Sequence, residues 1–492
     1  MGARPNVVVI MTDQQRWDTL GATGNAAIRT PHLDALAAGG ALFDLAFVPI
    51  PLCTPSRACL FTGQYPTRHG VRGNVLNLSD DSPNLLRALR DAGYATYLAG
   101  KDHLFTPEQR DRLFDDVARY DHFGRVEGEG PVDPRERAVR PGRRAAMFEK
   151  YGERDPHDPA DQPTARITDA AIGMVGEARA AGRPFFLWLS YPDPHPPYIV
   201  PEPYASMYRD VPLPEPVGGG DELAGKPPRQ RITPRLMEME GYDAGDLRRL
   251  REIYCGAITF IDDQIGRFVA SLDAAGLRED TLIVFMSDHG DYLGDHGMVR
   301  KSPTLYDCLV RIPLIVSCPG RIPSVRIGET MVESVDIAPT LLELAGVAVP
   351  AAMEGRSLVP LLTGEAITHR DTVFAVYGTE GEPYTEAELM QPDPGGDEGD
   401  GHPKGARWFS PLVSRGQLAM LRTARWKLVY YQGGEGELYD MEADPNELRN
   451  RYDDPACADV RTEMTRALLD RLLAALPTRP ARPVADAPAS QH

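Results

Sequence analysis

The sequence predicts an α/β protein: a large, mostly parallel sheet sandwiched by helices, followed by a smaller C-terminal α+β part built on an antiparallel sheet. Three observations support this fold class. The chain has 492 residues, which is too long for one small core. As far as residue 346, short β-branched runs alternate with stretches of helical periodicity, a pattern typical of parallel sheets. Beyond that residue, strand-like runs follow one another with only tight turns between them.

The elements of the first part follow from apolar runs and helix-end signals. We expect strands over residues 6–13, 94–100, 184–190, 281–288 and 312–317. We expect helices over residues 30–40, 82–93, 168–182, 246–276 and 336–346. In the first of these helices, Thr30 suits the N-cap and Pro31 suits the first turn. The helix over 246–276 carries an apolar stripe at helical spacing, which predicts a buried face.

The second part reads as antiparallel strands closed by a helix. The strands are expected within residues 371–377, 418–433 and 436–442, and the helix over residues 459–476. We therefore place a domain boundary between residues 1–365 and residues 366–492. Residues 390–405 are rich in Gly, Pro and Asp, which predicts a flexible loop, and residues 481–492 are expected to form a frayed tail.

Composition excludes several classes of partner. The formal net charge is −18, and an acidic protein repels nucleic-acid backbones, so we expect no nucleic-acid partner. We find neither a signal peptide nor a transmembrane segment, and we therefore predict a cytoplasmic protein without a membrane partner. The six cysteines show no framework spacing, which is typical of reduced thiols. The sequence is compatible with a homo-oligomer.

Polar side chains follow four of the predicted strands. The pairs Asp13-Gln14 and Asp288-His289 follow two strands, Lys101 and His103 follow a third, and His195 follows a fourth. In an open α/β sheet, ligands bind beyond the carboxyl ends of the strands, so these groups are expected to meet. Each of them taken alone also fits an ordinary turn residue, Asp13 a helix N-cap, and His289 a buried structural histidine.

Four of these residues suit a divalent cation. Asp13, Gln14, Asp288 and His289 offer two carboxylates, an amide oxygen and an imidazole. Calcium is the natural ion for the oxygen ligands, and the imidazole makes manganese or magnesium reasonable alternatives.

The stretch "PIPLCTPSRACLFTG", residues 49–63, places a cysteine where a helix begins. Thr54 suits the N-cap of that helix, and Gly63 suits its end. Cys53 therefore lies at a helix N-terminus, where backbone N–H groups favour an anion, and Arg57 lies one turn further on. A thiolate there is expected to be a nucleophile of low pKa. A cysteine hydrolase would explain it, but a thiolate beside a carboxylate-held cation is unusual for acyl transfer.

The motif Cys-Thr-Pro-Ser-Arg and the "ACLFTGQYPTRHG" around it resemble the signature of the type I sulfatases, in the alkaline phosphatase superfamily. The resemblance extends over nearly the whole chain, through "NVVVIMTDQQRWDTLG", "AGKDH", "YPDPHPPY", "SDHGDYLGDHG", "VRIPLIV" and "DIAPTLLELAG". It implies an alkaline-phosphatase-like fold and a sulfuric ester hydrolase, with a small sulfated molecule as substrate. It also implies that a formylglycine-generating enzyme oxidises Cys53 to Cα-formylglycine, whose hydrated form supplies the nucleophilic hydroxyl.

The resemblance also assigns roles to the other residues. Asp13, Gln14, Asp288 and His289 hold the cation, and Arg57 steadies the nucleophilic oxygen. Lys101 and Lys301 bracket the sulfate, His103 contacts the second hydroxyl of the hydrated formylglycine, and His195 lies on the leaving-group side. Asn74 is expected near the substrate. The sequence leaves open whether the leaving group is a phenol, a sugar or an alkyl alcohol.

Two residues depart from the sulfatase pattern and define the main alternative. Sulfatases more often have a second acid at the position of Gln14 and an Asn at the position of His289. The Gln/His pair resembles the one in phosphonate monoester hydrolases and related phosphodiesterases. Those relatives lack the Lys-x-His pair present here as Lys101 and His103, which favours a sulfatase. A non-catalytic protein that binds sulfated ligands is a third reading, but it requires a defective site, and every expected position is filled.

Overall fold

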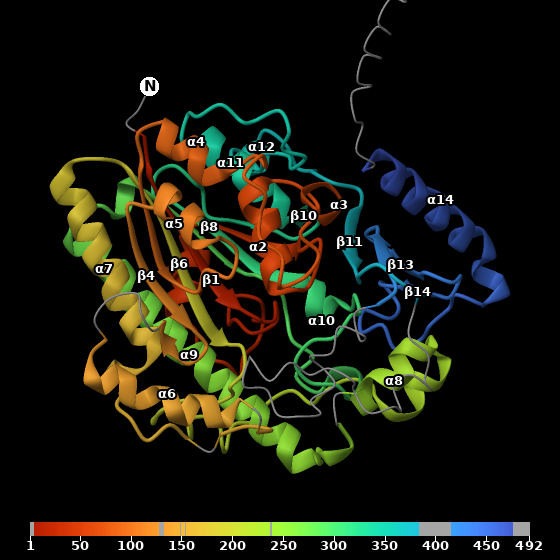
Figure 1. Cartoon of the computed structure of the whole chain (residues 1–492). Helices are drawn as coiled ribbons and strands as arrows, with labels where there is room; N and C mark the ends of the chain where they lie inside the picture. The colour runs from red at the N-terminus through yellow and green to blue at the C-terminus, as the bar shows by residue number, and fades with distance from the viewer. Residues whose placement is uncertain are drawn as a thin grey trace, which may run out of the picture.

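The computed structural model describes residues 4–126, 132–147, 149–152, 154–236, 239–382 and 415–475. Within them, a ten-stranded mixed sheet lies between two layers of helices (Figure 1). Its five central strands, β7, β1, β6, β3 and β4, are adjacent in that order and parallel. They are β1 (Asn6–Asp13), β3 (Ala95–Gly100), β4 (Asp116–Asp121), β6 (Phe185–Pro194) and β7 (Thr281–Ser287). The predicted fold class is confirmed.

The rest of the sheet contains β8 (Arg311–Ser317), which the sequence predicted, and strands that it did not reveal. Strand β8 is antiparallel to β7 because the chain returns from β7 without a crossover helix that spans the sheet. Strand β2 (Ala41–Phe47) escaped prediction, since its apolar run is interrupted by a half-buried Asp44 beside an irregularity in its register with β8. The remaining strands are β5 (Gly124–Arg125), β9 (Val325–Ile327) and β10 (Val332–Glu333).

Side chains of β1 alternate between two hydrophobic layers. Val7 and Val9 belong to one buried cluster and Val8 to the other, as the period of two in a strand requires. One layer contains the helices α1 (Pro31–Ala38), α7 (Pro163–Ala181) and α9 (Ala244–Ala274). The opposite layer contains α2 (Cys53–Thr62), α4 (Leu85–Asp91), α5 (Pro107–Leu113) and α11 (Ile337–Leu344). The remaining α-helices are α3 (Pro66–His69), α6 (Pro134–Ala146), α8 (Pro228–Leu236), α10 (Asp307–Val310), α12 (Val359–Leu362) and α14 (Ala458–Ala474).

The C-terminal part forms the predicted antiparallel sheet, with α14 packed against it (Figure 1). Its strands are β11 (Val373–Tyr377), β12 (Leu418–Arg422), β13 (Trp426–Tyr431) and β14 (Gly436–Asp440). Buried residues of this sheet, such as Phe374 and Met420, belong to the same hydrophobic cluster as Phe61 of α2. The two sheets therefore share one core, and the boundary at residue 365 stays a prediction. The predicted loop 390–405 and tail 481–492 lie outside the described residues.

In the described part of the chain, no helix is both long enough and apolar enough to cross a lipid bilayer.

Candidate active site

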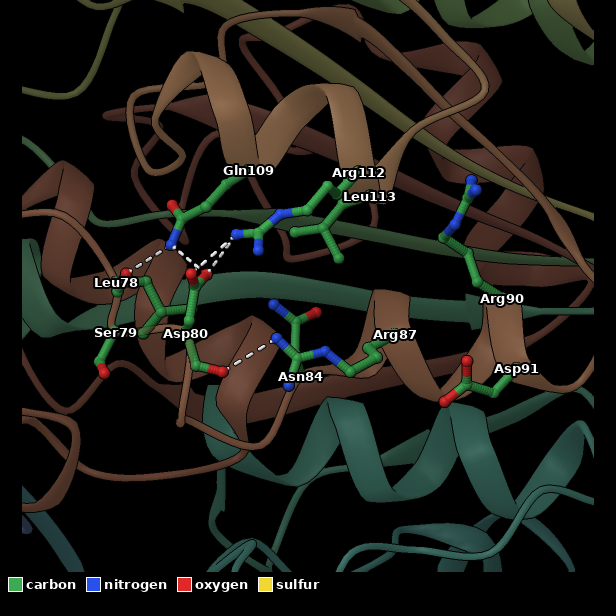
Figure 2. Close-up of a pocket in the computed structure, with 10 residues that line it drawn as sticks. All are labelled: Leu78, Ser79, Asp80, Asn84, Arg87, Arg90, Asp91, Gln109, Arg112 and Leu113. Atoms are coloured by element: carbon green, nitrogen blue, oxygen red, sulfur yellow. Dashed lines mark hydrogen bonds and ion pairs between the residues drawn. The ribbon is translucent and has the colours of Figure 1, made fainter.

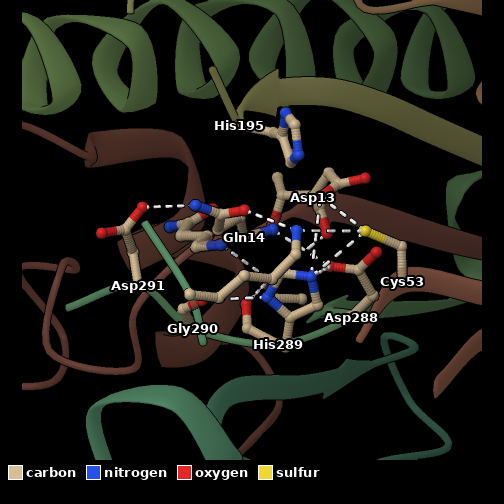
Figure 3. Close-up of polar contacts among 12 residues, drawn as sticks. Asp13, Gln14, Cys53, His195, Asp288, His289, Gly290 and Asp291 are labelled. Carbon is tan, nitrogen blue, oxygen red and sulfur yellow. Dashed lines mark hydrogen bonds and ion pairs between the residues drawn. The ribbon is translucent and has the colours of Figure 1, made fainter. Parts of the chain in front are cut away.

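The central strands deliver their polar residues to one edge of the sheet, as the sequence predicted. Asp13 ends β1, Asp288 directly follows β7, Lys101 directly follows β3 and His195 directly follows β6. Figure 3 shows Asp13, Asp288 and Cys53 in one network, with His195 standing beside it. Because these strands are parallel neighbours, their carboxyl ends converge and bring the residues together.

Four side chains form a compact donor set. Asp13, Cys53, Asp288 and His289 each offer one ligand atom, and these atoms all lie within 4.8 Å of one another. His289 Nδ1 lies 2.9 Å from the Gly290 carbonyl oxygen, to which it donates, so the Nε2 lone pair faces the site. All four residues are buried. The donors therefore fit a divalent cation, because carboxylates and a neutral imidazole are its usual ligands.

The amide of Gln14 is oriented by a carboxylate behind the site. Gln14 Nε2 donates to Asp291 Oδ2 at 2.5 Å, which leaves Gln14 Oε1 free to face Lys301 Nζ at 2.8 Å. Asp291 is held in turn by the Tyr198 hydroxyl at 2.7 Å and by the Leu293 backbone N–H at 2.7 Å. The backbone of Gln14 has a positive φ of 70°, which non-glycine residues rarely adopt. Gln14 is thus fixed with its oxygen toward the Lys301 ammonium, which also contacts Cys53.

The start of α2 differs from the prediction in one detail. The helix begins at Cys53, and its N-cap is Leu52 in extended conformation, so the assignment of Thr54 as N-cap was wrong. The Thr54 backbone N–H donates instead to Asn74 Oδ1 at 3.1 Å, and the Thr54 hydroxyl donates to the Asn74 carbonyl oxygen at 3.4 Å. A contact across 20 residues thus satisfies this helix end. Gly63 ends the helix in the left-handed conformation, as predicted.

The Cys53 sulfur is surrounded by cation ligands and an ammonium group. Its Sγ lies 3.3 Å from His289 Nε2, 3.4 Å from Lys301 Nζ and 3.6 Å from Asp13 Oδ1. Burial and the nearby Asp13 carboxylate alone would raise the pKa of the thiol. The positive charges of Lys101 and Lys301, together with His289, outweigh them and lower the pKa of Cys53 well below its usual value. The environment favours an anion at this position.

Arg57 lies behind the cation ligands and is fully buried. Its Nε and Nη2 donate to Asp288 Oδ2, both at 3.0 Å, and Nη2 also donates to Asp13 Oδ2 at 3.2 Å. Its Nη1 donates to the Lys101 carbonyl oxygen at 2.8 Å and to Ser190 Oγ at 2.9 Å. The guanidinium therefore bridges the two carboxylates and fixes the start of the segment that carries Lys101.

The pKa values of Asp13 and Asp288 are shifted in opposite directions. Burial raises the pKa of both, but the Lys101 ammonium, which pairs directly with Asp13, helps to hold the pKa of Asp13 well below its usual value. The pKa of Asp288 is raised, first by burial and then by the negative charge of Asp13. A divalent cation between them would supply the missing positive charge.

The opening of the site is bordered by three histidines. His103 has a positive φ of 54° and an exposed side chain, and both partial desolvation and Lys101 lower its pKa. His195 Nδ1 lies 2.6 Å from the Pro196 carbonyl oxygen, and burial followed by His122 lowers its pKa well below the usual value. His122, which the sequence analysis missed, accepts a hydrogen bond from Lys101 Nζ at 2.9 Å. Its sequence signal is its position directly after β4, a short strand near the sheet edge whose apolar residues are interrupted by charged ones.

A cavity of about 260 Å³ lies between α4 and α5, away from these residues, and Figure 2 shows the residues that line it. Its arginines already have partners: Arg112 pairs with Asp80, and Arg90 with Asp115. None of the predicted site residues lines it.

Comparisons with known proteins agree with this geometry. A family model described as "Sulfatase" matches residues 5–347, and one described as "N-sulphoglucosamine sulphohydrolase, C-terminal" matches residues 414–473. An arylsulfatase of Clostridium perfringens is 30% identical over 483 residues, which cover 91% of this chain and 90% of that protein. A multifunctional alkaline phosphatase superfamily protein of Trinickia caryophylli is 30% identical over 515 residues and 95% of each chain.

Solved structures give the same fold. A phosphonate monoester hydrolase of Agrobacterium radiobacter superposes with a TM-score of 0.77 at 27% identity over 96% of each chain. A protein solved with its substrate D-glucosamine-2-N,6-O-disulfate superposes with a TM-score of 0.76 over 96% of this chain and 98% of that chain. At 23% identity, the second likeness is evidence for the fold alone.

Proposed function

This chain belongs to the type I sulfatase family of the alkaline phosphatase superfamily, and we propose that it hydrolyses a small sulfate monoester with residue 53 as the nucleophile. The family match over residues 5–347 makes it a sulfuric ester hydrolase. The observation that carries the residue assignment is the convergence of Cys53, four cation donors and two lysines at one sheet edge.

The proposal also requires a modified residue 53 and a divalent cation. Residue 53, once oxidised by a formylglycine-generating enzyme, would present a hydrated aldehyde, and the cation held beside it would supply the positive charge that lowers the pKa of the attacking hydroxyl. Asp13, Gln14, Asp288 and His289 are the proposed ligands, with calcium as the first candidate and manganese or magnesium as alternatives. All four proposed ligands are buried, and the fixed orientations of the Gln14 amide and the His289 ring support the assignment.

The charged residues bind the substrate and hold the donor set. Lys101 and Lys301 are proposed to neutralise the sulfate, which explains how a chain of net charge −18 attracts an anion. Arg57 keeps Asp13 and Asp288 in place through its buried hydrogen bonds. Asn74, first expected to contact substrate, is proposed to hold the N-terminus of α2 through Thr54.

Two histidines are proposed to move protons. His195 donates to the departing alcohol or phenol oxygen, a contribution of roughly 10²–10⁴-fold for general acids. Burial and then His122 lower the pKa of His195, so the free enzyme holds this ring neutral. The negative charge of a bound sulfate ester is needed to raise that pKa and protonate the ring. His103 would take the proton from the second hydroxyl of the hydrated aldehyde, so that the C–O bond to sulfate breaks and the aldehyde forms again.

The decisive experiment compares kcat/KM for an aryl sulfate and a phosphonate monoester. The protein used is one whose residue-53 peptide has the mass of formylglycine, and Cys53→Ala is the control. Preference for the sulfate, lost in the control, is the expected result. Sulfate turnover that survives in the control would overturn the role of residue 53.

Phosphonate monoester or phosphodiester hydrolysis is the second candidate. Gln14 and His289 favour it, as do the fold matches to phosphonate monoester hydrolases, of which that of Silicibacter pomeroyi is 30% identical with a TM-score of 0.76. Lys101 and His103 favour the sulfatase. A higher kcat/KM for the phosphonate would mean that the Gln/His pair is the better guide.

We also propose a cytoplasmic location. All six cysteines are free thiols, as is typical of a reducing compartment. Recovery of the native protein from the culture medium rather than from the cytoplasmic fraction would refute this.

A further inference from the structure

His122 lies in a two-residue turn at the edge of the active site. The turn joins β4 to β5, whose pairs Tyr120–Arg125 and Asp121–Gly124 leave only His122 and Phe123 between them. The Asp121 carboxylate accepts from the backbone N–H groups of Phe123 at 2.8 Å and Gly124 at 3.0 Å. Because β4 is parallel to β3, this rigid turn lies at the same sheet edge as Lys101.

The ring of His122 contacts two groups that the proposed function uses. Lys101 Nζ donates to its Nε2 at 2.9 Å, and the ring stacks on His195 with centroids 3.9 Å apart and planes 20° apart. An ammonium group can only donate, so Nε2 accepts, the ring proton is on Nδ1 and the imidazole is neutral. The Nδ1 atom is buried and has no partner among the described residues.

A single buried arginine ties both histidine segments together. Arg143 of α6, 2% exposed, donates from Nε to the His122 carbonyl oxygen at 2.9 Å and from Nη2 to Asp193 Oδ1 at 2.5 Å. Asp193 lies two residues before His195, and its other oxygen accepts from Thr164 Oγ1 at 2.5 Å. The stacked rings are therefore fixed from behind by one guanidinium.

We propose that His122 is a positioning residue with two roles. Its Nε2 atom aims the Lys101 ammonium at the substrate sulfate, and its ring is the surface on which His195 stacks. Arg143 fixes the segments that carry both histidines. The other partner of the Lys101 ammonium is the Asp13 carboxylate. Without the His122 acceptor, this carboxylate is the one remaining partner of the ammonium among the described residues, and the ammonium is drawn toward Asp13 and away from the sulfate. The inference rests on the proposed function, because Lys101 and His195 are assigned to the sulfate and the leaving group there.

Two variants separate the role of His122 Nε2 as a hydrogen-bond acceptor from the role of its ring in stacking on His195. His122→Phe keeps a flat ring for stacking but has no acceptor, whereas His122→Gln offers an amide oxygen near the position of Nε2 but no ring. His157→Phe is the matched control, because His157 is half-buried, bonds to Asp155 and contacts none of the site residues. Each protein is first checked for an unchanged unfolding midpoint and an equal fraction of formylglycine at residue 53.

The kinetic readouts differ for the two roles. For His122→Phe we expect KM and the inhibition constant of inorganic sulfate to rise about tenfold, the effect of losing one hydrogen bond to a charged group. For His122→Gln we expect an inhibition constant near that of the wild type and a lower kcat, with the greatest loss for aryl sulfates of poor leaving groups. Equal losses in both variants on every substrate, or no loss in either, would overturn the proposal.

A crystal structure of each variant decides the point independently of activity. We expect Lys101 Nζ to turn toward Asp13 in His122→Phe and to keep its position in His122→Gln. An unmoved Lys101 in His122→Phe would refute the positioning role even if sulfate esters are turned over. If the wild type turns over no sulfate ester, the proposed function fails, and the position of Lys101 still tests the role of His122.

Discussion

Replacement of Arg57 by methionine tests whether this arginine and the cation both neutralise Asp13 and Asp288. The Arg57 guanidinium is fully buried and bridges Asp13 and Asp288, so Arg57→Met leaves two buried carboxylates facing each other. Removing one partner of a buried ion pair costs about 3–5 kcal/mol. At ~2.1 cal/mol/K per residue, the unfolding entropy of 492 residues is roughly 1 kcal/mol/K, so the Tm falls by about 3–5 °C.

We expect a divalent cation to reduce this loss of Tm. Bound between the same two carboxylates, calcium replaces part of the lost positive charge and stabilises the variant more than the wild type. The assay is differential scanning calorimetry of both proteins in EDTA and in excess calcium. Arg112→Met is the control, because Arg112 and Asp80 form an exposed pair, and such pairs contribute little to stability. A Tm loss in Arg57→Met that is identical with and without calcium would refute the shared role.

Three further results are expected. Asp291→Ala frees the Gln14 amide to rotate, and by calorimetric titration the affinity for the cation falls about 10–100-fold; an unchanged affinity would exclude Gln14 as an oriented ligand. Asn74→Ala leaves the Thr54 N–H without its acceptor and lowers the free energy of unfolding by about 1 kcal/mol in urea titrations. Loss of turnover with unchanged stability would instead indicate that Asn74 contacts the substrate. Burial lowers the pKa of His69 to about 3, below its unfolded value near 6.5, so the neutral ring stabilises the fold above pH 6.5 and this contribution is lost as the pH falls toward 3. Urea titrations at pH 7 and pH 5 should differ by about 2 kcal/mol more in the wild type than in His69→Gln, and equal differences would contradict the assignment.

The central strands could be predicted because their sequences are continuous apolar runs. β1, β3 and β7 lie within one residue of their predicted bounds. Once those strands were taken as parallel neighbours, the meeting of Asp13, Lys101 and Asp288 followed from topology alone. The direction of β8 could not be predicted, because an apolar run looks the same in a parallel and an antiparallel strand.

The supporting contacts could not be predicted because they join segments far apart in the chain. Asn74 bonds Thr54 across 20 residues and Gln14 bonds Asp291 across 277, and nothing in the local pattern pairs them. His122 was missed for a different reason. Its strand, β4, lies near the edge of the sheet and has charged residues among only three apolar ones, so it was not predicted as a strand whose end would mark the histidine.

The charges of the site explain why its two candidate substrates need a kinetic test. Arg57, Lys101 and Lys301 face only two carboxylates, so the site is positive even before a divalent cation adds its charge. A sulfate monoester and a phosphonate monoester each carry one negative charge, so this excess attracts both. A glutamate in place of Gln14 would remove the excess and pair with Lys301 Nζ, which now lies 2.8 Å from the Gln14 amide oxygen. The neutral amide therefore leaves the Lys301 ammonium available to the substrate, and discrimination between the two esters falls to Lys101, His103 and the proton donor at the leaving group.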